Sequence, residues 1–474
     1  MLFYEPLFLF LFAPAVYLFY LAVETRLKPR MLVLLAASII FYAWSEPLFV
    51  FVVFASVALD LLVAGRIEAS VEGSPARKLW LAAGVCSNLG ILVYFKYTGF
   101  IVQNYSALIS SFGFAPLTVP NIALPIGVSF IVFEKITYLV DVHRRVTPPA
   151  KSATLYALYV FFFPKLLAGP IIKYHDIAGQ MESCPPAHVD DFVTGFSRFM
   201  WGVMKKLLLA DVFASGCDLV FAHEAFELGF VEAWAGVIFF TFQIYFDFSG
   251  YSDMAIGLAR MFGFRLLENF NEPYVATSMT DFWRRWHISL TSWIREYLYF
   301  PLGGSRAGAL RTQINLWVCF LASGVWHGAA WTFVAWGAYN GFFLVLDRLF
   351  LARWLATLPI WLANALTFLA VMVGWTIFRA VSLSQAGGML ALMVKPWAKG
   401  PSDAMIPSFY WLAALVGFAI VVAQRAALYI PGFDWAALAR KHALAANTLL
   451  ALLFLAALAK GLADPFKPFI YFRF

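Results

Sequence analysis

The chain has 474 residues, of which 62% are hydrophobic and only 13% are charged, whereas soluble domains are about 45–50% apolar. This composition predicts a polytopic protein embedded in the lipid bilayer and excludes a sizeable soluble domain. The net charge is +7. No basic run could follow a phosphate backbone, so the excess of Lys and Arg is typical of cytoplasmic loops and does not indicate nucleic-acid binding.

The first four membrane spans are predicted from apolar runs long enough to cross a bilayer. They cover Pro6–Val23, Met31–Trp44, Leu48–Ala64 and Leu79–Phe95. The N-terminus has no basic region before its apolar run, so we interpret this run as a retained span rather than a cleaved signal peptide. The loops at residues 24–30 and 65–78 are basic and therefore predicted to be cytoplasmic, which places the N-terminus outside.

Two segments in the middle of the chain are apolar but irregular. Pro125–Arg145 contains Glu134 and Lys135, and Leu155–Ile172 contains Lys165 and is interrupted by two prolines. Because backbone in lipid must satisfy its own hydrogen bonds, broken helices are tolerated where they pack on protein or line a cavity. We predict buried or re-entrant helices around a central chamber or tunnel. The alternative is ordinary tilted spans with a proline kink.

The rest of the chain also reads as helical. Phe192–Phe221 is predicted to be one long helix and Phe230–Phe248 a clear span. Thr280–Tyr299 is predicted to be a single amphipathic helix that starts with a Thr280-Asp281 cap. Further helices are predicted at Ile314–Gly324, Trp331–Leu349, Trp361–Phe378, Phe409–Val422 and Leu444–Leu462.

The predicted fold class is therefore an all-α polytopic membrane protein with about 11 to 13 membrane-embedded helices. We expect one integral membrane domain over residues 1–474. Its predicted parts are N-terminal helices (1–123), a core that contains the candidate functional motifs described below (124–349) and C-terminal helices with an aromatic tail (350–474).

One histidine, His327, lies inside the long apolar run Ser323–Phe333, beside Trp326 and several small residues. An ionisable residue in a membrane segment predicts a functional site, because histidine can accept and return a proton near neutral pH. The small neighbours allow another backbone or a ligand to approach the ring closely. The alternative is a packed histidine that is bonded to a neighbouring helix.

Charged residues in the apolar segments form a second candidate set. Lys165, Arg284 and Arg285 could face the phosphates of an anionic substrate, since Arg offers a bidentate fork. Asp247 and Asp253 also belong to this set. The alternative for any of these residues is structural ion pairing, for example between Glu134 and Lys165. No HExxH motif and no paired His/Cys spacing is present, so no metal site is predicted.

Four windows in order along the chain resemble the membrane-bound O-acyltransferase (MBOAT) superfamily. They are QIYFDFSGYSDMAIG (Gln243–Gly257), NFNEPY (Asn269–Tyr274), DFWRRWHISLTSWIREYLYFPLGG (Asp281–Gly304) and SGVWHGAAWTF (Ser323–Phe333). The chain is most similar to the bacterial branch that acts in alginate O-acetylation. The family often carries a neutral Gln where this chain has Glu134.

The resemblance implies an O-acyltransferase in which His327 matches the essential intramembrane histidine and His287 the second histidine. The C-terminal aromatic end, Phe469–Phe474, also resembles the family and implies an acyl relay on Tyr471. The alternative for this end is an aromatic anchor at the membrane interface. Arg284, Arg285, Lys165, Trp326, Asp247 and Asp253 are the expected donor- or substrate-binding residues.

The expected reaction moves an acetyl group from a cytoplasmic thioester, acetyl-CoA, to a hydroxyl of an extracytoplasmic polysaccharide. The resemblance implies the bacterial inner membrane and a periplasmic SGNH-type acetyltransferase partner, with no bound cofactor. Two alternatives stay open, namely D-alanyl transfer from a carrier-protein thioester and a polysaccharide-pathway transporter without bond chemistry. A transporter would need the buried charges but not a histidine of fixed identity.

Overall fold

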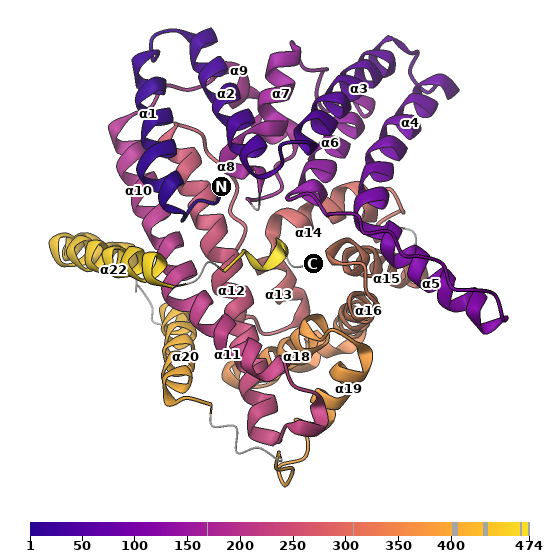
Figure 1. The fold of residues 1–474 in the computed structure, drawn as a ribbon, viewed down its shortest axis with the longest axis vertical. Helices are drawn as coiled ribbons and strands as arrows, with labels where there is room; N and C mark the ends of the chain where they lie inside the picture. The colour runs from indigo at the N-terminus through magenta and orange to yellow at the C-terminus, as the bar shows by residue number, and fades with distance from the viewer. Residues whose placement is uncertain (168, 307, 401–405, 430–434, 465–466, 473–474) are drawn as a thin grey trace. The chain divides into compact units, whose positions relative to one another are not determined.

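The computed structural model describes residues 1–474 except 168, 307, 401–405, 430–434, 465–466 and 473–474 (Figure 1). The described residues form helices and connecting loops, with no strand among them. They divide into two compact units. Unit 1 contains Met1–Phe199 and Ala255–Leu267, and unit 2 contains Met200–Met254 and Glu268–Phe474. The predicted division into a core and two flanking parts stays a prediction.

Unit 1 starts with the predicted N-terminal spans. A π-helical turn, Phe8–Phe12, continues into α1 (Ala13–Ala22). It is followed by α2 (Leu27–Ser45), α3 (Phe49–Ala69), α4 (Pro75–Leu92), the π-helical segment Val93–Tyr97 and α5 (Thr98–Ser111). All four predicted N-terminal runs are helical. Ser74 caps α4 by accepting a hydrogen bond from the Arg77 N–H, and Pro75 occupies its first position, both common at helix starts.

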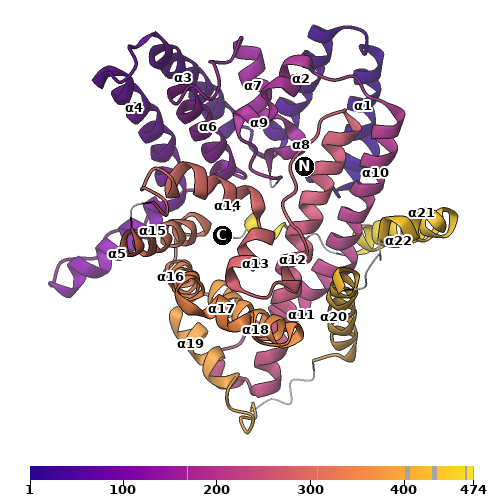
Figure 2. The ribbon, with the colours of Figure 1, turned by 180° about the vertical axis from the view of Figure 1, so that it is seen from behind.

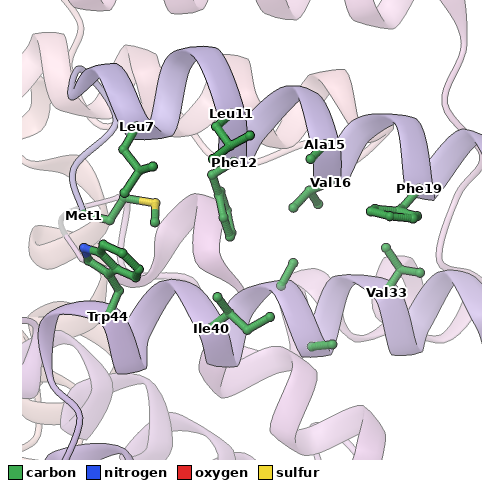
Figure 3. A pocket seen from close by; sticks show the side chains of 12 residues that line it. Met1, Leu7, Leu11, Phe12, Ala15, Val16, Phe19, Val33, Ile40 and Trp44 are labelled. Atoms are coloured by element: carbon green, nitrogen blue, oxygen red, sulfur yellow. The ribbon is translucent and has the colours of Figure 1, made fainter.

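An apolar cavity of about 400 Å³ lies between α1 and α2 (Figure 3). The view shows side chains of α1 and of the segment before it facing Val33, Ile40 and Trp44 of α2. Aliphatic and aromatic groups make up this lining, which is typical of a packing gap that faces lipid rather than of a site for chemistry.

The irregular middle segments of unit 1 are buried and broken as predicted. They form α6 (Val128–His143), α7 (Ala153–Phe161), α8 (Phe163–Leu166) and α9 (Tyr174–Ser183). The helix of α7 stops at Phe162, and Pro164 lies in the first turn of α8. Lys165 forms a buried ion pair with Glu134, and Lys135 forms another with Asp60 at 3.3 Å. The structural alternative for Glu134 and Lys165 is therefore confirmed.

Two long helices contribute residues to both units. α10 (Val189–Met204) continues through a π-helical segment, Lys205–Ala210, into α11 (Asp211–Phe221), which confirms the predicted long helix. α12 runs over Phe230–Met261, well past the predicted end at Phe248. The QIYFDFSGYSDMAIG window therefore lies entirely on α12.

Unit 2 contains the remaining helices (Figures 1 and 2). They are α13 (Met279–Arg285), α14 (Ile288–Ile294), a π-helical segment at Arg295–Tyr299, α15 (Ala309–His327), α16 (Trp331–Leu346), α17 (Ala352–Leu355), α18 (Ile360–Arg379), α19 (Leu383–Leu392), α20 (Ser408–Tyr429), α21 (Trp435–Lys441) and α22 (Ala443–Ala463). α16 packs against α15 on one side and α18 on another.

Six helices of the described chain are long and apolar enough to cross a membrane, namely Leu27–Ser45, Phe49–Ala69, Pro75–Ser111, Ile360–Arg379, Ser408–Ala426 and Ala443–Ala463. The chain is thus an all-α protein with the character of a multi-pass membrane protein. The larger predicted number of embedded helices and the central chamber stay predictions.

One helix prediction is wrong in detail. Thr280–Tyr299 is not a single helix, because α13 ends at Arg285 and α14 starts at Ile288. His287 has a left-handed backbone with φ 44°, which no α-helix can contain. The N-cap is Ser278 rather than the predicted Thr280-Asp281 pair, since the Ser278 side chain accepts a hydrogen bond from the Asp281 N–H.

Candidate active site

His327 is the last residue of α15, where that helix meets α16 closely. A Cβ atom on Gly324 would lie 2.3 Å from the Phe333 carbonyl oxygen, and one on Gly337 would lie 2.4 Å from the Phe320 carbonyl oxygen. Only glycine therefore allows the two helices to approach this far. The prediction that small residues around His327 permit close backbone approach is confirmed.

The His327 ring is enclosed by aromatic side chains. Ring centroids of Trp326, Trp336 and Phe378 lie 4.9, 5.0 and 5.4 Å from it, each at a steep angle. The histidine is 4% exposed. The imidazole of His327 is therefore held among buried aromatic rings at the end of α15.

His287 lies in the break between α13 and α14 and is fully buried. The segment that precedes α13 stabilises this break, because the Ile288 N–H donates to the Asn269 carbonyl at 2.9 Å and the Asn271 N–H donates to the Arg285 carbonyl at 2.9 Å. Backbone groups that have no partner within the helix at the break thus form hydrogen bonds with the NFNEPY segment.

The side chain of Asn269 also determines the tautomer of His287. Asn269 Oδ1 accepts from the Ser289 backbone N–H at 3.2 Å, so this end of the amide is the oxygen. His287 Nδ1 lies 3.1 Å from the same oxygen and must therefore donate. A neutral His287 then carries its lone pair on Nε2, which has no hydrogen-bond partner among the described residues. Nε2 of His287 is thus available to accept a hydrogen bond.

The C-terminal tail brings Tyr471 to both histidines. Its ring centroid is 5.6 Å from that of His327 and 6.3 Å from that of His287, and it packs on Phe248 of α12 at 4.5 Å. Tyr471 is partly buried. The tail can be followed in Figure 1 from α22 past α12 toward α13 and α14. Of the predicted aromatic end, Phe474 lies outside the described residues.

A buried ionic cluster holds the tail in this place. The Ile470 N–H donates to Asp247 Oδ2 at 2.8 Å. Asp247 pairs with Lys206 at 3.0 Å, and Lys206 also pairs with Asp211 at 2.9 Å. The tail residue Lys467 in turn donates to the Asp211 carbonyl at 2.9 Å. Lys206 belongs to the π-helical segment of the α10–α11 helix, and such segments are frequent at functional sites.

The predicted site residues thus separate into two groups. His327, His287, Trp326, Tyr471 and, through the tail, Asp247 gather in unit 2. The remaining four do not belong to this group, although three of them are also in unit 2. Asp253 pairs with Lys205 at 2.6 Å and Arg285 with Asp281 at 2.9 Å, while Arg284 is exposed on the last turn of α13. Lys165 belongs to unit 1, in its ion pair with Glu134.

Several side chains of the site were missed by the sequence analysis. Asn269 lies in NFNEPY, one of the four windows that resemble the family. A polar residue in such a window could have indicated a role in the site. No sequence signal indicated Trp336 or Phe378, because an aromatic residue on an apolar helix ordinarily serves to pack that helix against its neighbours. Together these residues place two imidazoles beside one phenol among buried aromatic rings, an arrangement suited to moving a proton and a group on oxygen.

Comparison with known proteins agrees with this chemistry. The profile of the MBOAT, membrane-bound O-acyltransferase family matches residues 76–387. The probable alginate O-acetylase AlgI of Pseudomonas putida is 39% identical and covers 100% of both chains. The peptidoglycan O-acetyltransferase of Helicobacter pylori is 35% identical over 83% of this chain and 80% of its own length. The teichoic acid D-alanyltransferase of Streptococcus thermophilus is 26% identical over 48% and 58%.

The family profile covers more than half of the chain, and the first of these relatives aligns from end to end. Both histidines that the resemblance singled out lie within the residues that the profile matches, and Tyr471 lies beyond them. This protein belongs to the membrane-bound O-acyltransferase family and is an O-acyltransferase.

Proposed function

We propose that the protein moves an acetyl group from acetyl-CoA to a hydroxyl group of an extracytoplasmic polysaccharide, with Tyr471 as the intermediate carrier. The observation that carries this proposal is the position of the Tyr471 ring, within 5.6 Å of the His327 ring and 6.3 Å of the His287 ring. An interface anchor would place the aromatic ring at the membrane surface, whereas this ring lies beside two buried imidazoles.

In the first step the phenol oxygen of Tyr471 attacks the thioester carbonyl. His327 takes the phenol proton and returns it to the leaving thiolate, so that an aryl ester forms, the thioester bond breaks and CoA leaves as the thiol. In the second step the acceptor oxygen attacks the ester carbonyl. His327 takes the acceptor proton and returns it to the Tyr471 oxygen, and no other reactant is consumed.

His287 serves this reaction as a positioning group. Its Nδ1–H is engaged by Asn269, so Nε2 accepts a hydrogen bond from the phenol or from the acceptor hydroxyl. Stabilisation of a developing oxyanion would need a donor at Nε2, which the neutral tautomer does not offer. Orientation of the attacking hydroxyl is therefore the role that the tautomer supports.

Arg284 and Arg285 are the proposed contacts of the donor's phosphates. Arg284 is exposed and Arg285 is half-buried at the end of α13, the helix that leads directly into His287. Lys165 is left out of the proposal because its buried ammonium group is committed to Glu134. Arg285 is also paired, with Asp281, but this pair is partly exposed and the guanidinium keeps further N–H donors. The acetyl group is favoured over D-alanine because the acetyl-transferring relatives are 35–39% identical and the D-alanyl-transferring relative is 26% identical.

The proposed location is the bacterial inner membrane, with the N-terminus on the outer side as the basic loops predict. The proposed partner is a periplasmic SGNH-type acetyltransferase that receives the acetyl group before the polysaccharide. The transporter alternative loses its support, because the interior charges on which it depended occur in ion pairs, Glu134 with Lys165 and Lys206 with Asp247.

The proposal is tested in proteoliposomes with radiolabelled acetyl-CoA on one side. Wild-type protein should become labelled on Tyr471, as found by mass spectrometry, and His327→Ala should lower the labelling rate about 100-fold or more, within the usual effect of removing a general base. His327→Gln separates the alternatives, since it keeps a polar side chain without the proton chemistry. Normal labelling of a correctly inserted His327→Ala protein would refute the proposal.

A further inference from the structure

Unit 2 contains a cavity of about 220 Å³ beside the aromatic rings that enclose His327. Gln243 of α12, Thr332 of α16 and Arg379 at the end of α18 supply its polar groups. Val381 also lines it and is 75% exposed, so the cavity reaches the surface there. Because α18 is a candidate membrane span that ends at Arg379, this mouth lies near a membrane surface rather than at mid-bilayer.

Gln243 is the unusual member of the lining. The residue is 3% exposed, and its Oε1 has no hydrogen-bond partner among the described residues. Buried carboxamides in folded proteins almost always find partners. An amide that is left without one at the wall of a cavity indicates a ligand group that binds there.

Arg379 does not turn the cavity into an anion site. Its guanidinium donates to Asp218 Oδ1 at 2.8 Å and lies over the Phe221 ring at 4.9 Å. The positive charge is thus already neutralised and the side chain held in place. The cavity therefore suits a neutral polar group.

The inner wall of the cavity includes one of the aromatic rings that enclose His327. Phe378 lines the cavity and packs edge-on against His327, with ring centroids 5.4 Å apart. Ile470 also lines the cavity, and the next residue is Tyr471. A group that enters at Val381 therefore reaches the side chains that border both His327 and the tyrosine.

We propose that this cavity is the entry site for the acyl acceptor, and that the acceptor enters as a single hydroxyl-bearing side chain of a partner protein that hydrogen bonds to Gln243. The inference rests on the function proposed above and assigns the acceptor's place in it. Phe378 turns aside as the hydroxyl passes from Gln243 to His327. Gln243 is a positioning residue, since it holds the acceptor but touches no bond that changes.

Polarity favours a side chain over a sugar ring. A sugar ring carries several hydroxyl groups, whereas the lining offers one amide without a partner at Oε1, the Thr332 hydroxyl and an arginine that is already paired. A serine-like group has one hydroxyl, which Gln243 and then His327 satisfy.

The step in this cavity is a transesterification. The acceptor oxygen forms a bond to the acetyl carbon, and the bond between that carbon and the Tyr471 oxygen breaks. The acceptor's proton passes through His327 to the tyrosine oxygen. No oxidant, metal or further reactant is required.

The test uses full-length protein in proteoliposomes, with acetyl-CoA as donor and N-acetylserinamide as the acceptor probe. Gln243→Leu removes the amide at similar size and should raise the acceptor KM about tenfold to a hundredfold, while the rate of Tyr471 acetylation in the absence of acceptor is unchanged. Gln243→Glu keeps an acceptor oxygen and should recover part of the loss. Equal acceptor KM values for wild type and Gln243→Leu would overturn the proposal.

A second variant tests the cavity without disturbing its polar groups. Val381→Cys, labelled with a bulky maleimide, should block transfer to N-acetylserinamide and leave Tyr471 acetylation intact. Unimpaired transfer after complete labelling would contradict entry at this mouth. Methyl glucoside as a competing acceptor decides the class of acceptor, because faster transfer to the sugar than to N-acetylserinamide would overturn the side-chain assignment.

Failure of the relay can be distinguished from failure of the cavity. If Tyr471→Phe still transfers acetyl to N-acetylserinamide, the relay is wrong, but the effect of Gln243→Leu on the acceptor KM still measures the cavity. If Tyr471 is acetylated normally and neither Gln243 nor Val381 affects transfer, the relay stands and the cavity proposal is refuted.

Discussion

The hydrogen bond between the Ile470 N–H and Asp247 leads to a quantitative prediction about the tail. This bond measures 2.8 Å, both groups are buried, and it is the direct tie next to Tyr471. A hydrogen bond to a charged group contributes about 1.5–3 kcal/mol. If tail binding limits the relay, Asp247→Ala should lower the rate of Tyr471 acetylation by about 10- to 150-fold.

Asp247→Asn should be milder. The asparagine oxygen still accepts from the Ile470 N–H, but as a neutral bond worth about 0.5–1.5 kcal/mol, so the expected loss relative to wild type is about tenfold or less. The graded order wild type, Asn, Ala is what a tail anchor requires. The assay is acetyl incorporation at Tyr471 per folded molecule, determined by mass spectrometry after a brief exposure to acetyl-CoA.

Asp60→Asn is the matched control. Asp60 is also a buried carboxylate paired with a lysine, Lys135 at 3.3 Å, and it too accepts further hydrogen bonds, but it lies in unit 1. The control should lower thermal stability, because a buried ion loses its partner, and should leave acetylation per folded molecule near wild type. Wild-type acetylation in Asp247→Ala would refute the anchor, as would equal losses in Asp247→Ala and Asp60→Asn.

Three further outcomes are expected. Asn269→Leu should free the Nδ1 of His287 and lower turnover with little change in the donor KM, whereas a binding role for this asparagine would raise the donor KM in steady-state assays. Phe378→Ala should raise acetyl-CoA hydrolysis without acceptor several-fold (on the order of 3- to 10-fold), because a water-poor site limits hydrolysis, and unchanged hydrolysis would contradict this. His175 accounts for a pH effect on stability, since hydrogen bonds to Asp141 and a neighbouring carboxylate raise its pKa to about 9. The stabilisation that protonated His175 contributes is fully present below pH 6.5 and is lost as the pH rises through about 9. His175→Gln should therefore remove a pH-dependent contribution to the free energy of unfolding on the order of 1 kcal/mol after solvent screening. The melting temperature of the variant should then fall less than that of the wild type between these pH values.

The helices and the two histidines could be predicted because their determinants are local. A run of apolar residues long enough for the bilayer specifies a span without reference to the rest of the chain. His327 is similarly conspicuous as one ionisable group within Ser323–Phe333. The pairing of Glu134 with Lys165 was open at the sequence level, since a lone buried charge requires a partner but does not identify it.

The break at His287 could not be predicted from helical spacing. Phe282, Trp286 and Leu290 recur four residues apart, so the apolar pattern continues across the break. The break is stabilised by two backbone hydrogen bonds, in which the Asn269 carbonyl accepts from the Ile288 N–H and the Asn271 N–H donates to the Arg285 carbonyl. A pattern within one segment carries no information about a partner segment. The position of Tyr471 could not be predicted for the same reason, because it depends on a hydrogen bond between residues 247 and 470, which are far apart in the sequence.

The surroundings of the two histidines differ in a way that separates their roles. His327 is enclosed by three aromatic rings at the end of α15. His287 is held in the break between α13 and α14 by Asn269, which fixes its tautomer and leaves the lone pair on Nε2. A fixed imidazole with its lone pair available suits a group that holds a hydroxyl in place. In the proposed reaction we therefore assign positioning to His287 and proton transfer to His327.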